Sequence, residues 1–272
     1  MIKLHDSFPA TLTGLDLVIG DSAKLLASVP PDTIDLVVTS PPYDGLRTYN
    51  GYYFDFETIA RQLYRVMKPG GCVVWIVGDA TIDGDETGTS FRQALFFKQC
   101  GFALHDTMIY EKTGTGACGS NRSYWQIFEY MFVFAKGKLK TVNRLKDTRN
   151  AKYGSVQTRG RISNNGDIKD NKIRIVPEFS VRSNVWRIQQ GNNGDNNDTG
   201  HPAPFPEILA ADHIASWSNP GDLIMDIFSG SGTTGKMCVL GGRNFLGFEI
   251  SKEYALASEK RINYVAAQLK MF

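Results

Sequence analysis

The stretch from Asp222 to Ser251 constrains the fold more than any other part of this chain. Leu223 to Ile227 has the apolar composition of a buried strand, and FSGSGTTG at 228–235 is a glycine-rich turn that leads into a helix. We expect that helix to span about Thr233 to Leu240 and the next strand to span Asn244 to Ile250. This order of elements predicts a Rossmann-like α/β fold with a mainly parallel central sheet.

The glycine-rich turn also indicates a ligand site. Glu249 ends the second strand 19 positions after Gly230, where Rossmann-like folds place an acid on ribose hydroxyls. Thr233 and Thr234 follow Gly232 in place of the third glycine of a dinucleotide fingerprint, and the chain has no GxxxxGK(S/T) phosphate loop. The pattern therefore favours a ligand that has a ribose but no phosphate.

A second buried strand ends in a rigid polar loop. Ile34 to Val38 is a short apolar run typical of a strand that is covered on both faces. Pro41 and Pro42 then restrict the backbone, so that the carbonyl oxygens of Ser40 and Pro41 are held in place as hydrogen-bond acceptors. Ser40 adds a hydroxyl and Tyr43 a flat ring at the carboxyl end of the strand, where open α/β sheets bind ligands. The loop is suited to gripping an exocyclic amine.

Residues 39–43, Thr-Ser-Pro-Pro-Tyr, resemble the catalytic (D/N/S)PP(Y/F) loop of the amino-methyltransferases that modify DNA bases. The FxGxGTT turn resembles the loop that binds S-adenosylmethionine (AdoMet, also written SAM) in the same enzymes. Because the proline loop precedes the glycine loop, the order resembles the circularly permuted β group of that family. A serine before the two prolines is typical of its cytosine N4 methyltransferases. The resemblance covers almost the whole chain outside a basic region.

The resemblance implies direct transfer of the AdoMet methyl group to the N4 amino group of a cytosine flipped out of the duplex. The catalytic residues that it implies are Ser40, Pro41, Pro42 and Tyr43, with the serine hydroxyl and the Pro41 carbonyl accepting the amine hydrogens while the tyrosine stacks on the base. The cofactor-binding residues that it implies are Asp21, Phe205, Pro206, Asp226, Phe228, Ser229, Gly230, Gly232, Thr233, Thr234 and Glu249. Asp21 also stands at a helix N-cap position, and the two roles are compatible.

Positive charge is concentrated in one region. Lys136 to Arg187 holds 14 basic and four acidic residues, while the whole chain has a net charge of +2. Such asymmetry predicts a surface for a polyanion. We therefore expect residues 1–135 and 186–272 to form the catalytic and AdoMet-binding domain and 136–185 to form a small target-recognition insertion. The candidate DNA-binding residues are Arg47, Arg144, Lys146, Arg149, Lys152, Arg159 and Arg161.

The remaining patterns describe the scaffold. Phe56 to Met67 has apolar residues at helical spacing, and Lys68-Pro69-Gly70-Gly71 follows as a helix-ending turn. A buried strand is then expected at Cys72 to Val77, and an amphipathic helix at Lys252 to Leu269. The four cysteines show no CxxC pair, so neither a metal site nor a disulfide framework is expected.

The expected partner is double-stranded DNA, with a cognate restriction endonuclease as a further candidate. The amino terminus lacks the apolar run of a signal peptide, and no run of about 18 apolar residues occurs. We therefore expect a cytoplasmic monomer or homodimer with no membrane partner.

Several alternatives stay open. Adenine N6 is the alternative target, because the adenine and cytosine amines are chemically alike. A nucleic-acid-binding module without catalysis would keep the fold, and a nicotinamide dehydrogenase would use the Gly230 loop and Glu249 but leave Ser40 to Tyr43 unexplained. RNA or protein as the methyl acceptor is also compatible with the sequence.

Overall fold

The computed structural model describes residues 1–42, 54–113, 124–162, 168–189 and 206–269, and the side chains of 158–162 and 168–172 are outside the description. The chain divides into two compact units, each considered by itself below. The first comprises residues 1–143 and 184–272, and the second comprises residues 144–183.

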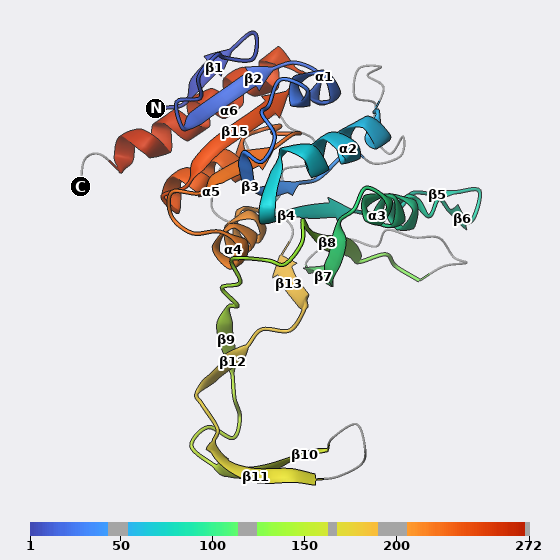
Figure 1. Ribbon diagram of the computed structural model, residues 1–272, viewed down its shortest axis with the longest axis vertical. Helices are drawn as coiled ribbons and strands as arrows, with labels where there is room; N and C mark the ends of the chain where they lie inside the picture. Colours follow the sequence, from blue (N-terminus) through green and yellow to red (C-terminus); the bar gives the residue numbers. More distant parts are fainter. Residues whose placement is uncertain (43–53, 114–123, 163–167, 190–205, 270–272) are drawn as a thin grey trace. The chain divides into compact units, whose positions relative to one another are not determined.

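The first unit is built on a nine-stranded sheet in the order β1-β2-β15-β14-β3-β4-β8-β7-β13 (Figure 1). Among these strands β8 runs antiparallel to both of its neighbours, and every other neighbouring pair is parallel. The strands are β1 (Lys3–His5), β2 (Leu15–Ile19), β3 (Ile34–Thr39), β4 (Met67–Val77), β7 (Ala103–Thr113), β8 (Phe128–Ala135), β13 (Val185–Gln189), β14 (Leu223–Asp226) and β15 (Asn244–Glu249). A short hairpin, β5 (Thr81–Ile82) and β6 (Asp85–Glu86), follows β4.

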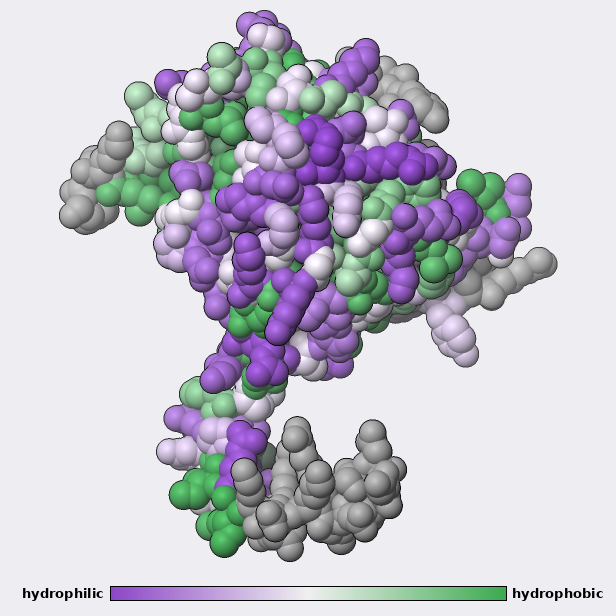
Figure 2. Space-filling model, in the orientation of Figure 1, coloured by the Kyte–Doolittle hydropathy of each residue, from purple (hydrophilic) through white to green (hydrophobic). Residues whose placement is uncertain are grey.

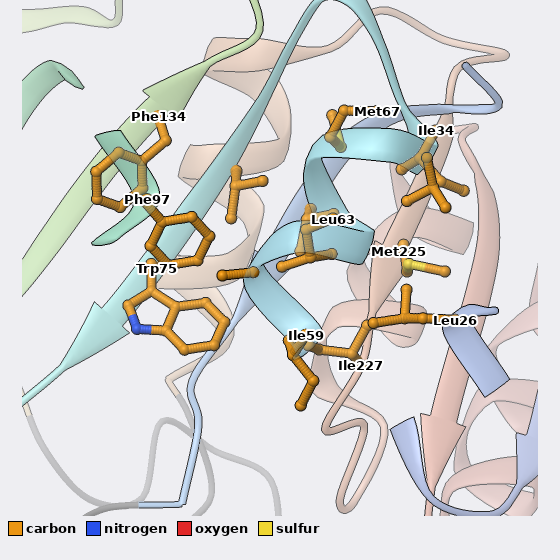
Figure 3. Packing of buried hydrophobic residues seen from close by; sticks show 14 of the residues in the cluster. Leu26, Ile34, Ile59, Leu63, Met67, Trp75, Phe97, Phe134, Met225 and Ile227 are labelled. Carbon is orange, nitrogen blue, oxygen red and sulfur yellow. The ribbon is translucent and has the colours of Figure 1, made fainter. Parts of the chain in front are cut away.

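Three helices, α1 (Ser22–Leu26), α2 (Phe56–Val66) and α3 (Thr89–Gln99), pack on one face of the sheet. Leu26, Leu63 and Phe97 come from these helices and meet Trp75 of β4 and Met225 of β14 in one buried cluster (Figure 3). Alternate strand residues point to opposite faces, so Ile224 and Phe245 belong to the other side.

That other side is covered by α4 (Glu207–Trp217), α5 (Thr233–Leu240) and α6 (Lys252–Gln268). Gly235 of α5 lies so close to its neighbours that an added Cβ would stand 2.5 Å from Ile262 of α6 and 2.8 Å from Phe245 of β15. The two helix layers bury the sheet, and the predicted α/β fold with a mainly parallel sheet is confirmed.

The helix-ending turn predicted at Lys68–Gly71 is wrong. Helix α2 ends at Val66, and β4 begins at Met67 and continues through this segment. The backbone finds strand-like partners here, because the Gly70 N–H donates to the Lys136 carbonyl at 2.7 Å and the Lys136 N–H to the Gly71 carbonyl at 3.0 Å. Gly71 is also closely packed, since an added Cβ would stand 2.5 Å from the Asp35 carbonyl oxygen.

The second unit consists of two antiparallel strand pairs. β9 (Lys146–Arg149) pairs with β12 (Phe179–Val181), and β10 (Val156–Ile162) pairs with β11 (Ile168–Ile175). The unit, residues 144–183, lies inside the predicted insertion at 136–185, whose role in target recognition stays a prediction. No helix among the described residues is long and apolar enough to span a bilayer.

Candidate active site

The carboxyl ends of four neighbouring parallel strands bring the predicted site residues to one edge of the sheet. The strands are β2, β15, β14 and β3, and they end next to Asp21, Glu249, Asp226 and Ser40. The Gly20 N–H donates to the Glu249 carbonyl at 2.9 Å, which joins the first two strand ends. The sheet order thus assembles one site from residues near both ends of the sequence.

The glycine loop between β14 and α5 is held in a conformation that requires glycine. Gly230 and Gly232 have φ values of +49° and +80°, a region that side-chain-bearing residues rarely adopt. A Cβ on Gly232 would lie 2.2 Å from the Ser258 Oγ of α6. Close packing against α6 therefore explains why a glycine stands at the N-cap of α5.

Glu249 is buried at the end of β15 and anchors this loop. Its Oε2 accepts the Gly230 N–H at 2.7 Å, and its Oε1 accepts the Ser251 N–H at 2.8 Å. Burial raises the pKa of Glu249 above its ordinary value, and the two backbone hydrogen bonds act in the opposite direction. Each carboxylate oxygen has lone pairs beyond these bonds, so the side chain can accept from ligand hydroxyls.

Asp226 is also buried, and its carboxylate is directed at groups of the protein. Oδ1 accepts from the Thr39 hydroxyl at 2.7 Å and from the Phe228 N–H at 3.1 Å, and Oδ2 accepts from the Thr234 hydroxyl at 2.7 Å. Burial raises the pKa of Asp226, and the three hydrogen bonds oppose the rise. The predicted direct contact of Asp226 with a cofactor stays a prediction.

The proline loop begins directly after β3. Pro41 is buried, and Ser40 and Pro42 are half-buried. Tyr43 and Arg47 lie outside the described residues. The described part of the loop is a short segment beside the glycine loop, because β3 and β14 are neighbours in the sheet.

Asp21 serves as the N-cap of α1, one of the two roles predicted for it. Its Oδ1 accepts the Ala23 N–H at 2.9 Å, and the neighbouring Ser22 hydroxyl donates to the carbonyl of Ile227, after β14. Pro206 stands at the N-cap position of α4, and Phe205 lies outside the described residues. The adenine and methionine contacts predicted for these residues stay predictions.

A charged cluster that the sequence reasoning missed supports the glycine loop. Arg261 of α6 donates to the Ser231 carbonyl and to the Thr233 hydroxyl, both at 3.2 Å, and it also contacts Glu207 of α4. Lys236 of α5 donates to the same Glu207 carboxylate at 2.7 Å. No motif marks Arg261, because it stands in a helix whose pattern indicates only that it covers the sheet.

The site leaves polar atoms for a ligand that offers hydroxyl or other polar groups. The Ser229 hydroxyl is buried in the glycine loop and has no hydrogen-bond partner within the part of the chain that the structure describes. Together with the remaining acceptor capacity of Glu249, it leaves polar atoms for a ligand to satisfy. No group of three His, Cys, Asp or Glu residues that could hold a metal ion occurs among the described residues.

The described basic candidates of the second unit are exposed. They are Arg144, Lys146, Arg149 and Lys152. Arg149 has a loose ion pair with Glu178 at 3.9 Å. Arg159 and Arg161 stand in β10, with side chains outside the description. Exposed cations of this kind are available to a polyanion, and their contact with DNA stays a prediction.

Comparisons with known proteins agree with this geometry. A family model described as DNA methylase, for N6 and N4 methyltransferases, matches residues 34–260. The chain is 54% identical over 246 residues to the orphan methyltransferase M.BamHII of Bacillus amyloliquefaciens, covering 88% of this chain and 92% of that protein.

Two solved structures share the fold. The cytosine-N4-specific PvuII DNA methyltransferase matches with a TM-score of 0.65 and 22% identity over 93% of this chain and 91% of its own. The complex of M1.HpyAVI with SAM matches with a TM-score of 0.62 and 23% identity over 91% of this chain and 98% of its own. The predicted Rossmann-like fold class is thereby confirmed, and the circular permutation stays a prediction.

Proposed function

This chain belongs to the N6/N4 DNA methylase family, and from that premise we propose that it methylates the N4 amino group of cytosine in DNA. It is a DNA methyltransferase, and AdoMet is its cofactor.

The observation that carries the proposal is the meeting of two loops at adjacent strand ends. The register pairs Leu36 of β3 with Ile224 of β14 and Val37 with Met225, so the proline loop and the glycine loop emerge side by side. One loop suits an amine and the other suits a nucleoside without phosphate. A methyl donor and its acceptor would therefore lie close together, which is the main requirement of a direct transfer.

We assign the glycine loop and its neighbours to AdoMet. Glu249 would accept from the ribose hydroxyls, and Ser229 would gain the partner that it lacks within the described chain. Asp21 would contact the adenine, and Phe205 and Pro206 would line the methionine side. When bound, AdoMet supplies a sulfonium methyl group, which is already activated toward a nitrogen nucleophile.

The proline loop would orient the target amine. The Ser40 hydroxyl and the Pro41 carbonyl would accept its two hydrogens, which turns the nitrogen lone pair toward the methyl carbon, while Tyr43 stacks on the base. Held in this way, the amine nitrogen would take the methyl group that bound AdoMet supplies and would release one proton to solvent. The chain supplies no covalent nucleophile in this scheme.

Cytosine is preferred to adenine because of Ser40. Serine is typical of the N4 enzymes that the loop resembles, and the PvuII enzyme, which has the same fold, is named cytosine-N4-specific. Adenine N6 is the alternative, since the family model covers both kinds of enzyme.

DNA would be held by the basic residues of the second unit. Arg144, Lys146, Arg149 and Lys152 are exposed cations that can neutralise phosphates. These contacts would offset the free energy of roughly a few kcal/mol that is needed to flip a base out of the duplex. Because M.BamHII is named an orphan methyltransferase, we favour action without a cognate restriction endonuclease over the predicted pairing with one.

The test is the identity of the methylated nucleoside. Plasmid and genomic DNA from a host without DNA methylation are incubated with the protein and AdoMet carrying a deuterated methyl group, then digested and analysed by mass spectrometry. Labelled N4-methylcytosine supports the proposal. Labelled N6-methyladenine overturns the choice of base and keeps amino-group transfer, whereas unlabelled DNA in both samples contradicts the proposed function.

A further inference from the structure

One buried hydrogen-bonded group connects the two loops of the site. The Asp226 carboxylate accepts from the hydroxyl of Thr39, the residue before Ser40, and from the hydroxyl of Thr234, in the first turn of α5, both at 2.7 Å. It also accepts the Phe228 N–H at 3.1 Å, at the start of the glycine loop. Its partners therefore come from the ends of both loops.

We propose that Thr39, Asp226 and Thr234 form a positioning unit that sets the distance between the amine-binding loop and the cofactor-binding loop. The inference rests on the proposed function, because it gives these loops their roles. None of the three residues needs to touch the base or the methyl group. They act through Ser40 on one side and through the glycine loop on the other.

The position of this unit in the sheet supports the inference. The backbone register between β3 and β14 pairs Leu36 with Ile224 and Val37 with Met225. The hydrogen bond between Thr39 and Asp226 continues the connection beyond the last of these pairs, where the strands lead into the loops. The side-chain bond therefore links β3 and β14 past their last backbone pair, while Thr39 stays paired with Trp75 of β4 and Asp226 with Gly247 of β15.

The burial of the unit makes its geometry rigid. Thr39 is 1% exposed, Asp226 is 6% exposed and Thr234 is 2% exposed, so no partner can exchange readily with solvent. Loss of the Thr234 hydroxyl would remove the hydrogen bond that Oδ2 accepts, and loss of the Thr39 hydroxyl would leave Oδ1 with the Phe228 N–H alone; both changes are unfavourable for a buried carboxylate. Burial also raises the pKa of Asp226, which is the expected sign for an acid far from water.

Rigidity at this point matters for the reaction more than for the stability of the fold. Apolar residues at these three positions would pack without the desolvation of a carboxylate. A carboxylate with directed hydrogen bonds fixes the positions of its partners more closely than apolar contacts would. This matters because a displacement of about 1 Å between reacting groups can lower a rate about 10²-fold. The positioning unit thus fixes how the proline loop and the glycine loop lie relative to each other at the ends of β3 and β14.

The test uses Thr39→Val, which removes one hydroxyl at nearly constant shape, and Thr39→Ser, which keeps the hydroxyl. Single-turnover methyl transfer to plasmid DNA is measured at saturating AdoMet, and the dissociation constant of AdoMet is measured separately by calorimetry. We expect Thr39→Val to lower the rate about tenfold or more while AdoMet affinity changes less than about twofold. Thr39→Ser is expected to restore most of the rate.

A second pair of variants tests the coupling. Thr234→Val is expected to lower the rate as well. Because both hydroxyls act through Asp226, the fold loss of rate in the double variant Thr39→Val/Thr234→Val should be at most about one third of the product of the two single fold losses. Independent effects would multiply, and that result overturns the positioning unit. If Thr39→Val does not fold, Thr39→Ala is measured instead, with Thr39→Ser as its control; it is expected to show the same loss of rate, and a wild-type rate in the folded variant overturns the positioning unit.

The wild-type protein is measured in every series so that two failures are kept apart. Unlabelled DNA with the wild type contradicts the proposed function. Labelled DNA at equal single-turnover rates in the wild type and in folded Thr39→Val contradicts the positioning unit alone.

Discussion

Charged residues are buried and hydrogen-bonded at the carboxyl edge of the main sheet, whereas they are exposed in the unit at 144–183. At the sheet edge, Asp226 and Glu249 are buried, and protein groups donate hydrogen bonds to both. In the second unit, Arg149 and Lys152 are exposed, and Arg149 has a loose ion pair with Glu178. Buried charges fix positions, whereas exposed charges remain available to a polyanion.

The apolar residues of the two units differ in the same way. Trp75 and Phe97 are fully buried between the sheet and the helices (Figure 3). In the second unit, Ile173 is 75% exposed, and Val156 and Ile175, which pair across β10 and β11, are each 66% exposed. Figure 2 shows hydrophobic side chains at the surface of this unit. We therefore expect mutations in the first unit to act on stability and reaction geometry, and mutations in the second to act on DNA binding.

The largest effect is expected for Gly232→Ala. The new Cβ would meet Ser258 at 2.2 Å on a backbone with φ +80°. Left-handed strain and overpacking together predict a loss of roughly 2–5 kcal/mol in the free energy of unfolding, measured by urea denaturation.

Gly221→Ala is the matched control for this substitution. Gly221 has φ +89°, and an added Cβ would meet nothing within 4 Å. Only the backbone strain of roughly 1–2 kcal/mol is expected there. Equal losses in the two variants would contradict the close packing of the glycine loop on α6.

The second effect concerns cofactor affinity. Glu249→Gln keeps the size of the side chain but removes its charge and replaces one acceptor by an amide donor. We expect AdoMet to bind about tenfold to 100-fold more weakly by calorimetry, because hydrogen bonds to a charged group contribute about 1.5–3 kcal/mol. Glu253→Gln, at an exposed position of α6, is the control. Unchanged affinity in Glu249→Gln would remove this residue from the cofactor site.

The third effect is a pH dependence of stability. Because burial raises the pKa of Asp226 in the folded protein, its protonated form favours folding. This contribution is present below the ordinary value of 3.8 and is lost as the pH rises above it. Relative to Asp226→Asn, the wild type should therefore lose free energy of unfolding as the pH rises from about 4 through the raised pKa of Asp226. Glu249 is present in both proteins, and because the Asp226 charge also raises its pKa, part of the difference arises through Glu249 and has the same sign. A difference that does not vary with pH would contradict buried ionisation.

The smallest effect is expected in the second unit. Arg149→Gln and Lys152→Gln should each weaken DNA binding a few-fold and reduce the slope of log affinity against log salt by about one. AdoMet affinity and the free energy of unfolding should stay the same, because both side chains are exposed. Lys98→Gln, at an exposed position of α3, is the control. An unchanged salt slope would show that these cations do not contact phosphate.

The sequence predicted the elements whose pattern is local. The helix expected at Thr233 to Leu240 is α5 with the same bounds, and the strand expected at Asn244 to Ile250 is β15, which ends one residue earlier, at Glu249. Both segments have strong apolar patterns with clear ends. The turn predicted at Lys68–Gly71 was wrong because its backbone pairs with Lys136, far away in the chain.

The site could be predicted only in part for the same reason. Glycine and proline motifs located the two loops, since these residues restrict the backbone where they stand. The bond between Thr39 and Asp226 joins residues 187 positions apart, and no local pattern contains it. Arg261 was missed because its partners come from the glycine loop and from α4. The strands of the second unit were missed because their charged residues hide the alternation typical of a strand.

The most direct test of the central account is methyl transfer by Ser40→Ala. The proline loop is assigned to the amine and the glycine loop to AdoMet, so removing this hydroxyl should leave AdoMet affinity within about twofold and lower single-turnover methylation about 10²-fold. Ser28→Ala, at an exposed position after α1, should match the wild type in both measurements. Methylation at the wild-type rate by Ser40→Ala would contradict the account.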